Sequence, residues 1–443
     1  MESINYTCIG ASHIVENKVC QDYSLSINTD GLCAAVVCDG HGGKRYFRSD
    51  KGAEFAAKIT GEKIKEFVEN FDNSLISGKP FTQSLAKSDP KKTSSDDLFS
   101  IFNRLFTSIV STWYAQIEKH AKGNPLTDKE RSICEPEWIA EFENGVKIEK
   151  SYGSTLMAVV FTKEYWFAFH IGDGKMISLQ KNPIFSEPVP WDDKCFLNKT
   201  TSLCDNNPLD EFRYCYCGDG SFPDAVFLGS DGMDDSFGAT ENLADFYMKV
   251  ASSIVNDGKD KTFNDIKTIL PNLSKKGSQD DMSLAIVFDE LRISENLEVY
   301  KKWQLKKIDA EIAEKRKRTV KFETEKQQKK AEYESVKNRV KQAEETVAEK
   351  TAEYDTVKQA YLEHEKQINT LKEKLTSMMN FFSSKKQVML DAEEALNRAK
   401  QDLENANKDL KFAEKSCQIA VNEHKTEDSE LQKLLKKKIE LEN

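Results

Sequence analysis

The chain has neither glycine nor proline after Gly277, although its 443 residues include 20 Gly and 10 Pro. A domain with ordinary loops holds about 7% Gly and 5% Pro, so the stretch behind Gly277 is not built like one. This excludes an enzyme made of two similar α/β halves. We expect a compact domain at residues 1–290, followed by a helical tail at residues 291–443.

Other features are missing as well. No run of 18 apolar residues occurs, which excludes a membrane-spanning helix, and we expect no membrane partner. The first ten residues, MESINYTCIG, lack the basic and apolar parts of a secretory signal. The ten Cys form no Cys-x2-Cys pair, and most lie in apolar stretches. This pattern favours reduced thiols and a cytoplasmic location.

Charge is divided unevenly between the two parts. Residues 291–443 hold 33 Lys and Arg against 30 Asp and Glu, so their net charge is +3 and that of the preceding part is −13. Because phosphate contacts need cations, the acidic part argues against nucleic acid as a partner. Acidic residues can instead gather around hard metal ions. Residues 301–330 hold 12 basic and 5 acidic residues, which we interpret as a solvated helix face.

Short apolar or alternating runs predict several strands in the first 290 residues, with helices between them. The expected strands are 31–40, 151–162, 165–180, 210–217, 225–230 and 282–289. The expected helices are 51–71, 98–121, 240–256 and 260–270, and the segments 81–95 and 122–150 are expected to be irregular. An insertion at 74–150 carries a wide apolar helix face, which we expect to pack in the core. This order is typical of a layered α+β domain.

Carboxylates lie at the ends of the expected strands, mostly in Asp/Gly turns. Asp39, Asp173 and Asp231 follow apolar strands, whereas Asp22 and the pair Asp280-Asp281 precede them. Strand ends are rigid, and glycine lets a backbone approach a ligand closely. Converging carboxylates repel one another unless a divalent cation such as Mg²⁺ or Mn²⁺ lies between them. The sequence therefore predicts a metal site, with His41 beside it as an acid or base.

Six motifs occur in order along the first 290 residues. They are CQD (20–22), VVCDGHGG (36–43), YGSTL (152–156), HIGDGKM (170–176), LGSDGMDD (228–235) and QDDMSLAIVF (279–288). This set closely resembles the metal-dependent serine/threonine protein phosphatases of type 2C over about residues 5–290. GASH (10–13) followed by CQD is most similar to the bacterial branch. The resemblance implies a central β-sandwich flanked by helices on both sides, with a two-metal site at one edge.

The resemblance also assigns metal ligands, residue by residue. Asp39 would bridge two cations, and Gly40 would offer its carbonyl oxygen to one of them. Asp231 and Asp280 would ligate the other cation. Asp22 would lie beside the metals and act through water. The implied cofactors are two Mn²⁺ or Mg²⁺ ions.

A third ion and an acid are implied in the same way. Asp173, together with Asp231 and Asp235, resembles the weaker third-metal site of microbial members. His41 matches the general acid that protonates the leaving serine or threonine oxygen. Cations on a bridging water lower its pKa, so the reaction needs no Cys nucleophile. No Cys of this chain is followed by Arg at the Cys-x5-Arg spacing that a Cys-dependent phosphatase needs.

The chain departs from the family pattern at three positions. Gln21 stands where the family often has Glu, and Asn17 stands where many members have an Arg that grips phosphate. Gly174 replaces a Ser, which we expect to be harmless. The phosphate of the substrate is then held by the metals or by another group. The candidates are Ser12, His13 and Lys18.

The tail shows a sustained seven-residue pattern. Apolar residues alternate at spacings of three and four from Tyr333 to Met378, pause at 379–386, and resume from Met389 to Leu434. Such a repeat predicts a coiled coil. The second arm alternates Leu with Ala, which fits larger side chains of the first arm, so we favour an antiparallel hairpin with its tip near 380–384. The rival is a continuous parallel dimer.

The favoured function is therefore metal-dependent hydrolysis of phosphoserine and phosphothreonine in a phosphoprotein substrate. The tail would serve a protein partner or self-association. The alternative is a scaffold that binds phosphoproteins without turnover, a pseudophosphatase. Metal-dependent hydrolysis distinguishes the two.

Overall fold

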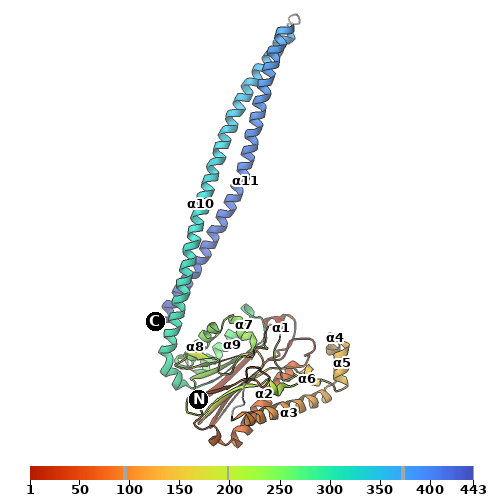
Figure 1. Ribbon diagram of the computed structural model, residues 1–443, viewed down its shortest axis with the longest axis vertical. Coiled ribbons are helices and arrows are strands. Elements are labelled where there is room, and N and C mark those ends of the chain that lie inside the picture. Colours follow the sequence, from red (N-terminus) through yellow and green to blue (C-terminus); the bar gives the residue numbers. More distant parts are fainter. Residues whose placement is uncertain (93–96, 197–198, 371–374, 443) are drawn as a thin grey trace. The chain divides into compact units, whose positions relative to one another are not determined.

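A computed structural model describes residues 1–92, 97–196, 199–370 and 375–442 (Figure 1). The chain forms two compact units, Met1–Lys302 and Trp303–Asn443. Among the described residues, no helix has both the length and the apolar character needed to cross a membrane.

Two antiparallel sheets form the centre of the first unit. Within the described residues their strand orders are β1-β11-β10-β7-β8 and β2-β3-β5-β6-β9-β4. The first sheet consists of β1 (Glu2–Cys8), β7 (Lys175–Leu179), β8 (Phe185–Ser186), β10 (Ala225–Gly229) and β11 (Met282–Phe288). The second sheet consists of β2 (Tyr23–Thr29), β3 (Leu32–Cys38), β4 (Thr82–Ser84), β5 (Leu156–Thr162), β6 (Trp166–Ile171) and β9 (Arg213–Cys217).

The two sheets pack face to face. Strand β3 is buried along its whole length, so both of its faces are covered. Because side chains alternate along a strand, Ala35 and Val37 join Val226 and Ala285 of the other sheet in one apolar cluster. The alternate residues, such as Val36, belong to a second cluster that includes residues of helices. Strand β3, which its apolar sequence predicted to be buried, therefore contributes side chains to two apolar clusters, one on each face.

Helices cover both outer faces of the sandwich (Figure 1). Helices α2 (Ser49–Asn70) and α3 (Phe99–Gly123) lie on the second sheet, where the rings of Phe102 and Phe167 are 5.3 Å apart. Helices α8 (Thr240–Asp257) and α9 (Lys259–Lys276) lie on the first sheet, where Tyr247 stacks on Phe227 at 4.4 Å. The expected sandwich flanked by helices is confirmed. The apolar face of α3 packs in the core, as its sequence favours.

Shorter elements complete the unit. They are α1 (Ala11–Val15), η1 (Asn73–Leu75), α4 (Asp128–Ile133), α5 (Pro136–Glu143), α6 (Ile148–Ser151), η2 (Pro208–Asp210) and α7 (Asp231–Phe237). Three of them, α4 to α6, lie where the sequence predicted irregular structure, so that prediction was wrong. A capping box between Thr127 and Glu130 begins α4, and this pattern is visible in the sequence.

Two further predictions need correction. The segment 165–180 is not one strand, because β6 and β7 belong to different sheets and the Gly172-Asp173-Gly174 turn lies between them. Gly172 has φ of +123°, which a side chain would strain. Helix α9 also continues through Pro271 to Lys276 instead of ending at residue 270. The C-terminal part of α9 packs against the rest of the first unit, since Ser274 is fully buried.

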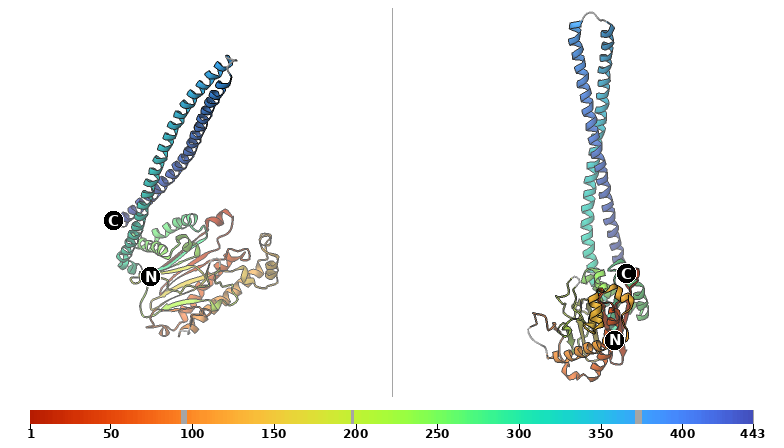
Figure 2. Two further views of the ribbon diagram at one scale, coloured as in Figure 1. Left: turned by 45° about the horizontal axis from the view of Figure 1, so that its top comes forward. Right: turned by 90° about the vertical axis from the view of Figure 1, so that its right-hand side faces the viewer.

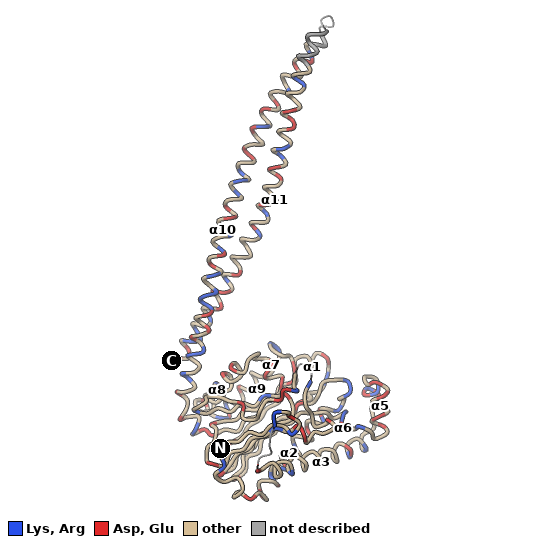
Figure 3. Tube along the Cα trace, in the orientation of Figure 1, with Lys and Arg blue, Asp and Glu red and all other residues tan. Residues whose placement is uncertain are grey.

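The second unit is a helical hairpin. Helix α10 (Glu290–Thr370) and helix α11 (Leu375–Glu442) run antiparallel, as Figure 2 shows. Ion pairs join the arms at successive levels, Asp309 with Lys438 at 2.7 Å and Glu323 with His424 at 2.9 Å. Basic and acidic residues are mixed along both arms (Figure 3). The favoured antiparallel hairpin is thus confirmed within one chain, and self-association of two chains stays a prediction.

The apolar seam of the hairpin follows the seven-residue pattern. Several of its predicted members are buried, and they are Val340, Leu396, Ala399, Ala406, Ala413, Ala420 and Leu431. The position of the tip was wrong, because residues 380–384 belong to α11. The connection between the arms falls at 371–374, outside the described residues.

The first residues of α10 belong to the sandwich unit. Tyr300 is fully buried, and its hydroxyl donates a hydrogen bond to the carboxylate of Asp224, next to the start of β10. The Asn296 side-chain amide donates to the same carboxylate at 2.9 Å. Asp224 is itself buried, so it depends on these donors.

We expect Tyr300→Phe to lower the free energy of unfolding of the sandwich unit by about 1–3 kcal/mol, because a buried carboxylate loses a donor. Urea unfolding of the full chain, followed by tryptophan fluorescence, measures the change. The matched control is Tyr333→Phe, a half-buried tyrosine of the same helix within the hairpin, with an expected change below about 0.5 kcal/mol. Equal effects of the two substitutions would contradict this account.

Candidate metal centre

The pairing of the strands brings the predicted carboxylates to one edge of the sandwich. In the second sheet, Cys38 at the end of β3 lies opposite Tyr23 at the start of β2. Asp39 and Asp22 are the next residues outward on these two strands. In the first sheet, Gly229 at the end of β10 lies opposite Lys175 at the start of β7. The segments with Asp231 and Asp173 therefore leave the sheet at one end.

Backbone hydrogen bonds fix the Asp39 turn. The backbone N–H of Asp39 donates to Thr155 Oγ1 at 3.0 Å, and the N–H of Thr155 donates to the Asp39 carbonyl at 2.8 Å. The Gly40 N–H donates to the Gln21 carbonyl at 3.1 Å. A Cβ at Gly40 would lie 2.6 Å from that carbonyl oxygen, so this close approach requires glycine.

The carboxylates act on one another electrostatically. Burial, followed by the charges of Asp231 and Asp22, raises the pKa of Asp39 well above its ordinary value. Burial and the neighbouring carboxylates of Asp173, Asp280 and Asp235 raise the pKa of Asp231 to about 6, although a hydrogen bond with Asp39 opposes the shift. These mutual shifts show that the predicted ligands form one cluster of like charges.

One buried carboxylate oxygen of the cluster has no hydrogen-bond partner among the described residues. Asp22 is buried, and its Oδ2 atom has no hydrogen-bond partner among the described residues. Burial and the charges of Asp281 and Asp231 raise the pKa of Asp22 well above its ordinary value. A buried carboxylate oxygen without a donor is costly, and a hard divalent cation is the group that suits such an oxygen set. The residues therefore fit the predicted cations.

A triad next to the cluster was missed in part by the sequence analysis. Among the described residues, His13, Asp280 and Asp281 alone form a set of three possible ligands whose atoms lie within 4.8 Å of one another. Asp22, Asp39 and Asp231 do not meet around a single point in this way.

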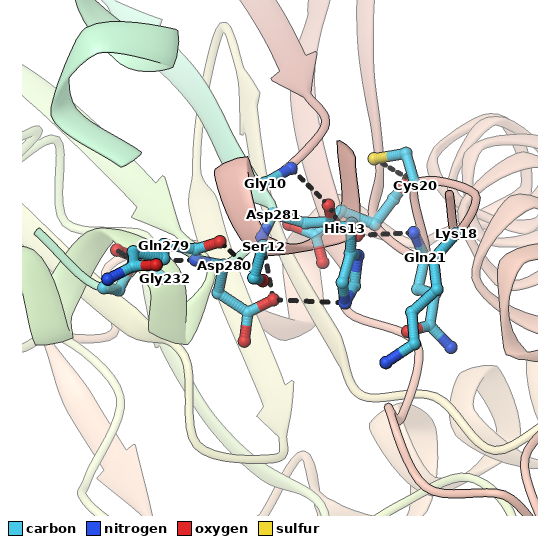
Figure 4. A network of polar contacts seen from close by, with 12 residues as sticks. Gly10, Ser12, His13, Lys18, Cys20, Gln21, Gly232, Gln279, Asp280 and Asp281 are labelled. Atoms are coloured by element: carbon cyan, nitrogen blue, oxygen red, sulfur yellow. Dashed lines mark hydrogen bonds and ion pairs between the residues drawn. The ribbon is translucent and has the colours of Figure 1, made fainter. Parts of the chain in front are cut away.

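Both carboxylate oxygens of Asp281 have hydrogen-bond partners on the segment 10–21 (Figure 4). Its Oδ1 atom accepts from the Gly10 N–H at 2.6 Å and lies 3.0 Å from His13 Nδ1, and its Oδ2 atom accepts from the Gln21 N–H at 2.6 Å. Although burial alone would raise it, the pKa of Asp281 is lowered by these three partners. The carboxylate thus ties the start of β11 to the segment 10–21.

The three candidates for holding phosphate lie in different settings. His13 is buried, with Nδ1 on Asp281 and Nε2 3.9 Å from Asp280. The bond to Asp281 raises the pKa of His13. Ser12 Oγ donates to the Gln279 carbonyl at 2.8 Å, which fixes the residue before Asp280. Lys18 is exposed and pairs with Glu16 at 2.6 Å.

Two departures from the family pattern have a structural reason. The Gln21 side-chain amide donates to the His41 carbonyl at 2.9 Å and to Ser49 Oγ at 2.5 Å. An ionised Glu has no proton for that carbonyl, so Gln suits this site. Asn17 has φ of +53°, a left-handed conformation that Asn tolerates better than most residues.

His41 lies inside the same edge. Its Nε2 atom is 2.7 Å from Ser202 Oγ, and its ring meets Tyr46 edge-on at 4.8 Å. Burial, with a smaller effect from Lys150, lowers the pKa of His41 to about 4. The His41 side chain is therefore neutral at pH 7 in the folded protein without metal or substrate.

The Asp173 turn is held from behind by a residue that no sequence motif indicated. Arg213, on β9, is buried and its Nη2 atom donates to the Gly172 carbonyl at 2.7 Å. Its Nη1 atom donates to the Pro190 carbonyl at 3.0 Å. Burial raises the pKa of Asp173, and Asp235 adds to the shift. Asp235 itself is exposed, on α7.

A family model described as Protein phosphatase 2C matches residues 9–270. No curated protein matches the chain.

Several solved structures are similar to the chain. One is the catalytic domain of the serine threonine protein phosphatase PstP in complex with two manganese ions, with 14% identity over 65% of this chain and 98% of that chain and a TM-score of 0.38. Another is the serine/threonine phosphatase Stp1 from Staphylococcus aureus, with 12% identity over 65% and 94% and a TM-score of 0.38. A third is PppA of Pseudomonas aeruginosa, with 16% identity over 65% and 96% and a TM-score of 0.38.

We expect Asp39→Asn to change stability in opposite directions with and without metal. In EDTA the variant should melt at a higher temperature than the wild type, because one of several repelling charges is gone. With Mn²⁺ at about 100 times its Kd, the wild type should gain about 2.7 kcal/mol and the variant much less. Calorimetry measures both. The control is Asp30→Asn, in an exposed Asp-Gly turn between β2 and β3, and a wild type indifferent to Mn²⁺ would refute the site.

Proposed function

The chain belongs to the protein phosphatase 2C family, and we propose on this premise that it hydrolyses phosphoserine and phosphothreonine in proteins with the help of Mn²⁺ or Mg²⁺. The observation that carries the proposal is the cluster of mutually repelling carboxylates with the orphan oxygen of Asp22. Such a cluster is poorly suited to a folded protein unless cations occupy it.

The ligand set proposed from the sequence is retained. Asp39 would serve both ions and the Gly40 carbonyl would serve one of them, whereas Asp231 and Asp280 would serve the other. Asp173 and Asp235 are the additional carboxylates for a third ion, and Asp22 acts through water. Bound divalent cations supply a water of lowered pKa and neutralise charge on the phosphoryl oxygens.

The side chains have separate tasks in this scheme. His41 holds the proton at Nε2 and delivers it to the leaving serine or threonine oxygen. Because the lowered pKa leaves His41 neutral in the protein without substrate, the imidazole must take up a proton before it can act as the acid. The negative charge of the arriving phosphate dianion favours this protonated imidazolium. Asp281 and Gln21 position the loops through their hydrogen bonds and take no part in the chemical step. The buried thiol of Cys38 takes no part, since burial raises its pKa well above the ordinary value.

We also propose that the hairpin docks a protein partner and does not pair two chains. Each arm already buries its apolar seam against the other, as Ala406 and Ala413 illustrate, so the seam offers little to a second copy. Outside the seam, Phe412 and Ile419 stand seven residues apart on α11 and are exposed. Two exposed apolar side chains on one face of a helix can pack against a helical segment of a partner.

Purified protein is expected to hydrolyse p-nitrophenyl phosphate and phosphothreonine peptides only when Mn²⁺ or Mg²⁺ is present. Asp231→Asn should reduce kcat/KM by about two orders of magnitude or more, since a ligand loss costs several kcal/mol of transition-state stabilisation. Asp210→Asn, at a half-buried partner of Lys87, is the control and should stay within about twofold. Metal-independent turnover would overturn the proposal, and no turnover with any metal would favour the pseudophosphatase.

The intrachain hairpin predicts a full-length protein with the mass of one chain. Light scattering coupled to gel filtration, at two concentrations a hundredfold apart, tests this directly. Ala413→Asp should open the seam by burying a charge and lower the helical content, whereas Lys411→Asp, on the exposed surface of the same helix, should not. A concentration-dependent dimer would restore the self-association reading.

A further inference from the structure

A cleft of about 810 Å³ opens beside the carboxylate edge. One side is formed by Gln21, Gly42 and Gly43, which adjoin the loop that carries Asp39 and His41. The other side is residues 123–133, at the end of α3 and in α4, which belong to the insertion. The volume is that of a typical ligand pocket, and none of the motifs in the sequence accounts for it.

The insertion wall is fixed by a buried arginine. Arg48, 5% exposed, donates from Nε to Glu130 Oε1 at 2.6 Å and from Nη2 to the Pro125 carbonyl at 3.2 Å. Its Nη1 atom donates to the Tyr152 hydroxyl at 3.1 Å. The capping box of Thr127 and Glu130 holds the same stretch. A wall held in this way needs little ordering when a ligand binds.

The cleft is basic on an acidic domain. Among its lining residues, Arg48 and Glu130 neutralise each other, and Lys18 is paired with Glu16 at 2.6 Å. Lys51 is paired with Glu54 at 2.9 Å and lies 4.0 Å from Asp50, the other acidic residue of the lining. Lys44 and Lys129 are exposed and form no ion pair within the described residues. The part of the chain before residue 291 nevertheless has a net charge of −13. Two unpaired lysines on such a surface indicate attraction for a negative ligand.

The cleft also presents apolar surface. Val19 is 60% exposed and Ile133 is 41% exposed, and they belong to opposite walls. A free inorganic anion would use the lysines and leave these side chains without a role. A polypeptide with acidic and apolar side chains would use both kinds of group. Because the cleft shares Gln21, Gly42 and Gly43 with the catalytic edge, such a chain would continue from a phosphorylated residue held there.

We propose that this cleft binds the stretch of substrate protein that adjoins the phosphorylated residue, and that it selects stretches carrying acidic and apolar side chains. The insertion at 74–150 thus contributes a specificity wall in addition to its core packing. This inference rests on the proposed phosphatase function for the position of the phosphorylated residue. The residues that carry it, Lys44, Lys129, Val19 and Ile133, have no part in the proposed catalysis.

Two phosphothreonine peptides of equal length test the proposal, one with Glu and Leu on both sides of the phosphothreonine and one with Lys in place of each Glu. For wild type, kcat/KM should be at least about tenfold higher for the Glu peptide. The double variant Lys44→Glu/Lys129→Glu should abolish or invert this preference while turnover of p-nitrophenyl phosphate stays within about twofold. Lys65→Glu, an exposed lysine of α2 away from the cleft, is the matched control and should keep the preference.

Binding is measured separately from catalysis. Fluorescence anisotropy of the labelled Glu peptide in EDTA, where no hydrolysis occurs, should show an affinity that falls about tenfold in the double variant and falls with added salt. Replacing Leu by Ala in the peptide should weaken binding to wild type but not to Ile133→Ser.

Each outcome tests either the proposal about the cleft or the proposed phosphatase function. Selective binding in EDTA without any metal-dependent turnover would support the cleft and refute the phosphatase function. Turnover of both peptides with an unchanged ratio in the double variant would overturn the cleft and leave the function standing. Equal loss of p-nitrophenyl phosphate turnover would also overturn it, because the lysines would then serve the reaction itself. Competition by inorganic phosphate with no preference between the peptides would reduce the cleft to an anion site and overturn the inference.

Discussion

The repulsion among carboxylates at one edge of the sandwich is the constraint on which the rest of the structure depends. Each of Asp22, Asp39 and Asp231 has a pKa raised by burial and by its neighbours, so the folded chain holds like charges where water screens them poorly. The two sheets hold them there by the register of their strands. A chain in which a strand slipped by one residue would turn every side chain of that strand to the other face, and the cluster would be lost along with the core.

Hydrogen bonds between segments around the cluster oppose this repulsion, and each such set of bonds is called a brace below. Asp281 draws Gly10, His13 and Gln21 to the start of β11, and Gln21 in turn draws the His41 loop toward β2. Each brace pairs a donor with an acceptor on segments far apart in the sequence. The departure at Gln21 from the family pattern can be understood in these terms. Its side-chain amide donates hydrogen bonds to the His41 carbonyl and to Ser49 Oγ, which a carboxylate could not do.

Much of this arrangement could be predicted from the sequence, and the remainder has identifiable physical reasons. Buried strands and Asp/Gly turns have strong local signals, so the strand ends could be predicted, whereas the sandwich was implied by the resemblance to the type 2C phosphatases. Asp280 and Asp281 are adjacent carboxylates, and only the tertiary structure decides that the second accepts backbone N–H groups from two distant segments. Arg213 and Arg48 act on carbonyl oxygens remote in sequence, which no local pattern reveals. The hairpin tip was misplaced because neither Gly nor Pro marks it.

The insertion shows how one segment can serve stability and selection together. Helix α3 buries Phe102, Phe106 and Trp113 against the second sheet, and that burial supplies the hydrophobic stabilisation that keeps the segment in place. Its continuation through residues 123–133 needs no core of its own, because Arg48 clamps it from the loop that also carries His41. A shift of the wall would therefore disturb the loop of the proposed acid, and a shift of that loop would disturb the wall. The Arg48 guanidinium, which pairs with the partly buried carboxylate of Glu130, thus couples the surface proposed to select a substrate to the edge proposed to act on it.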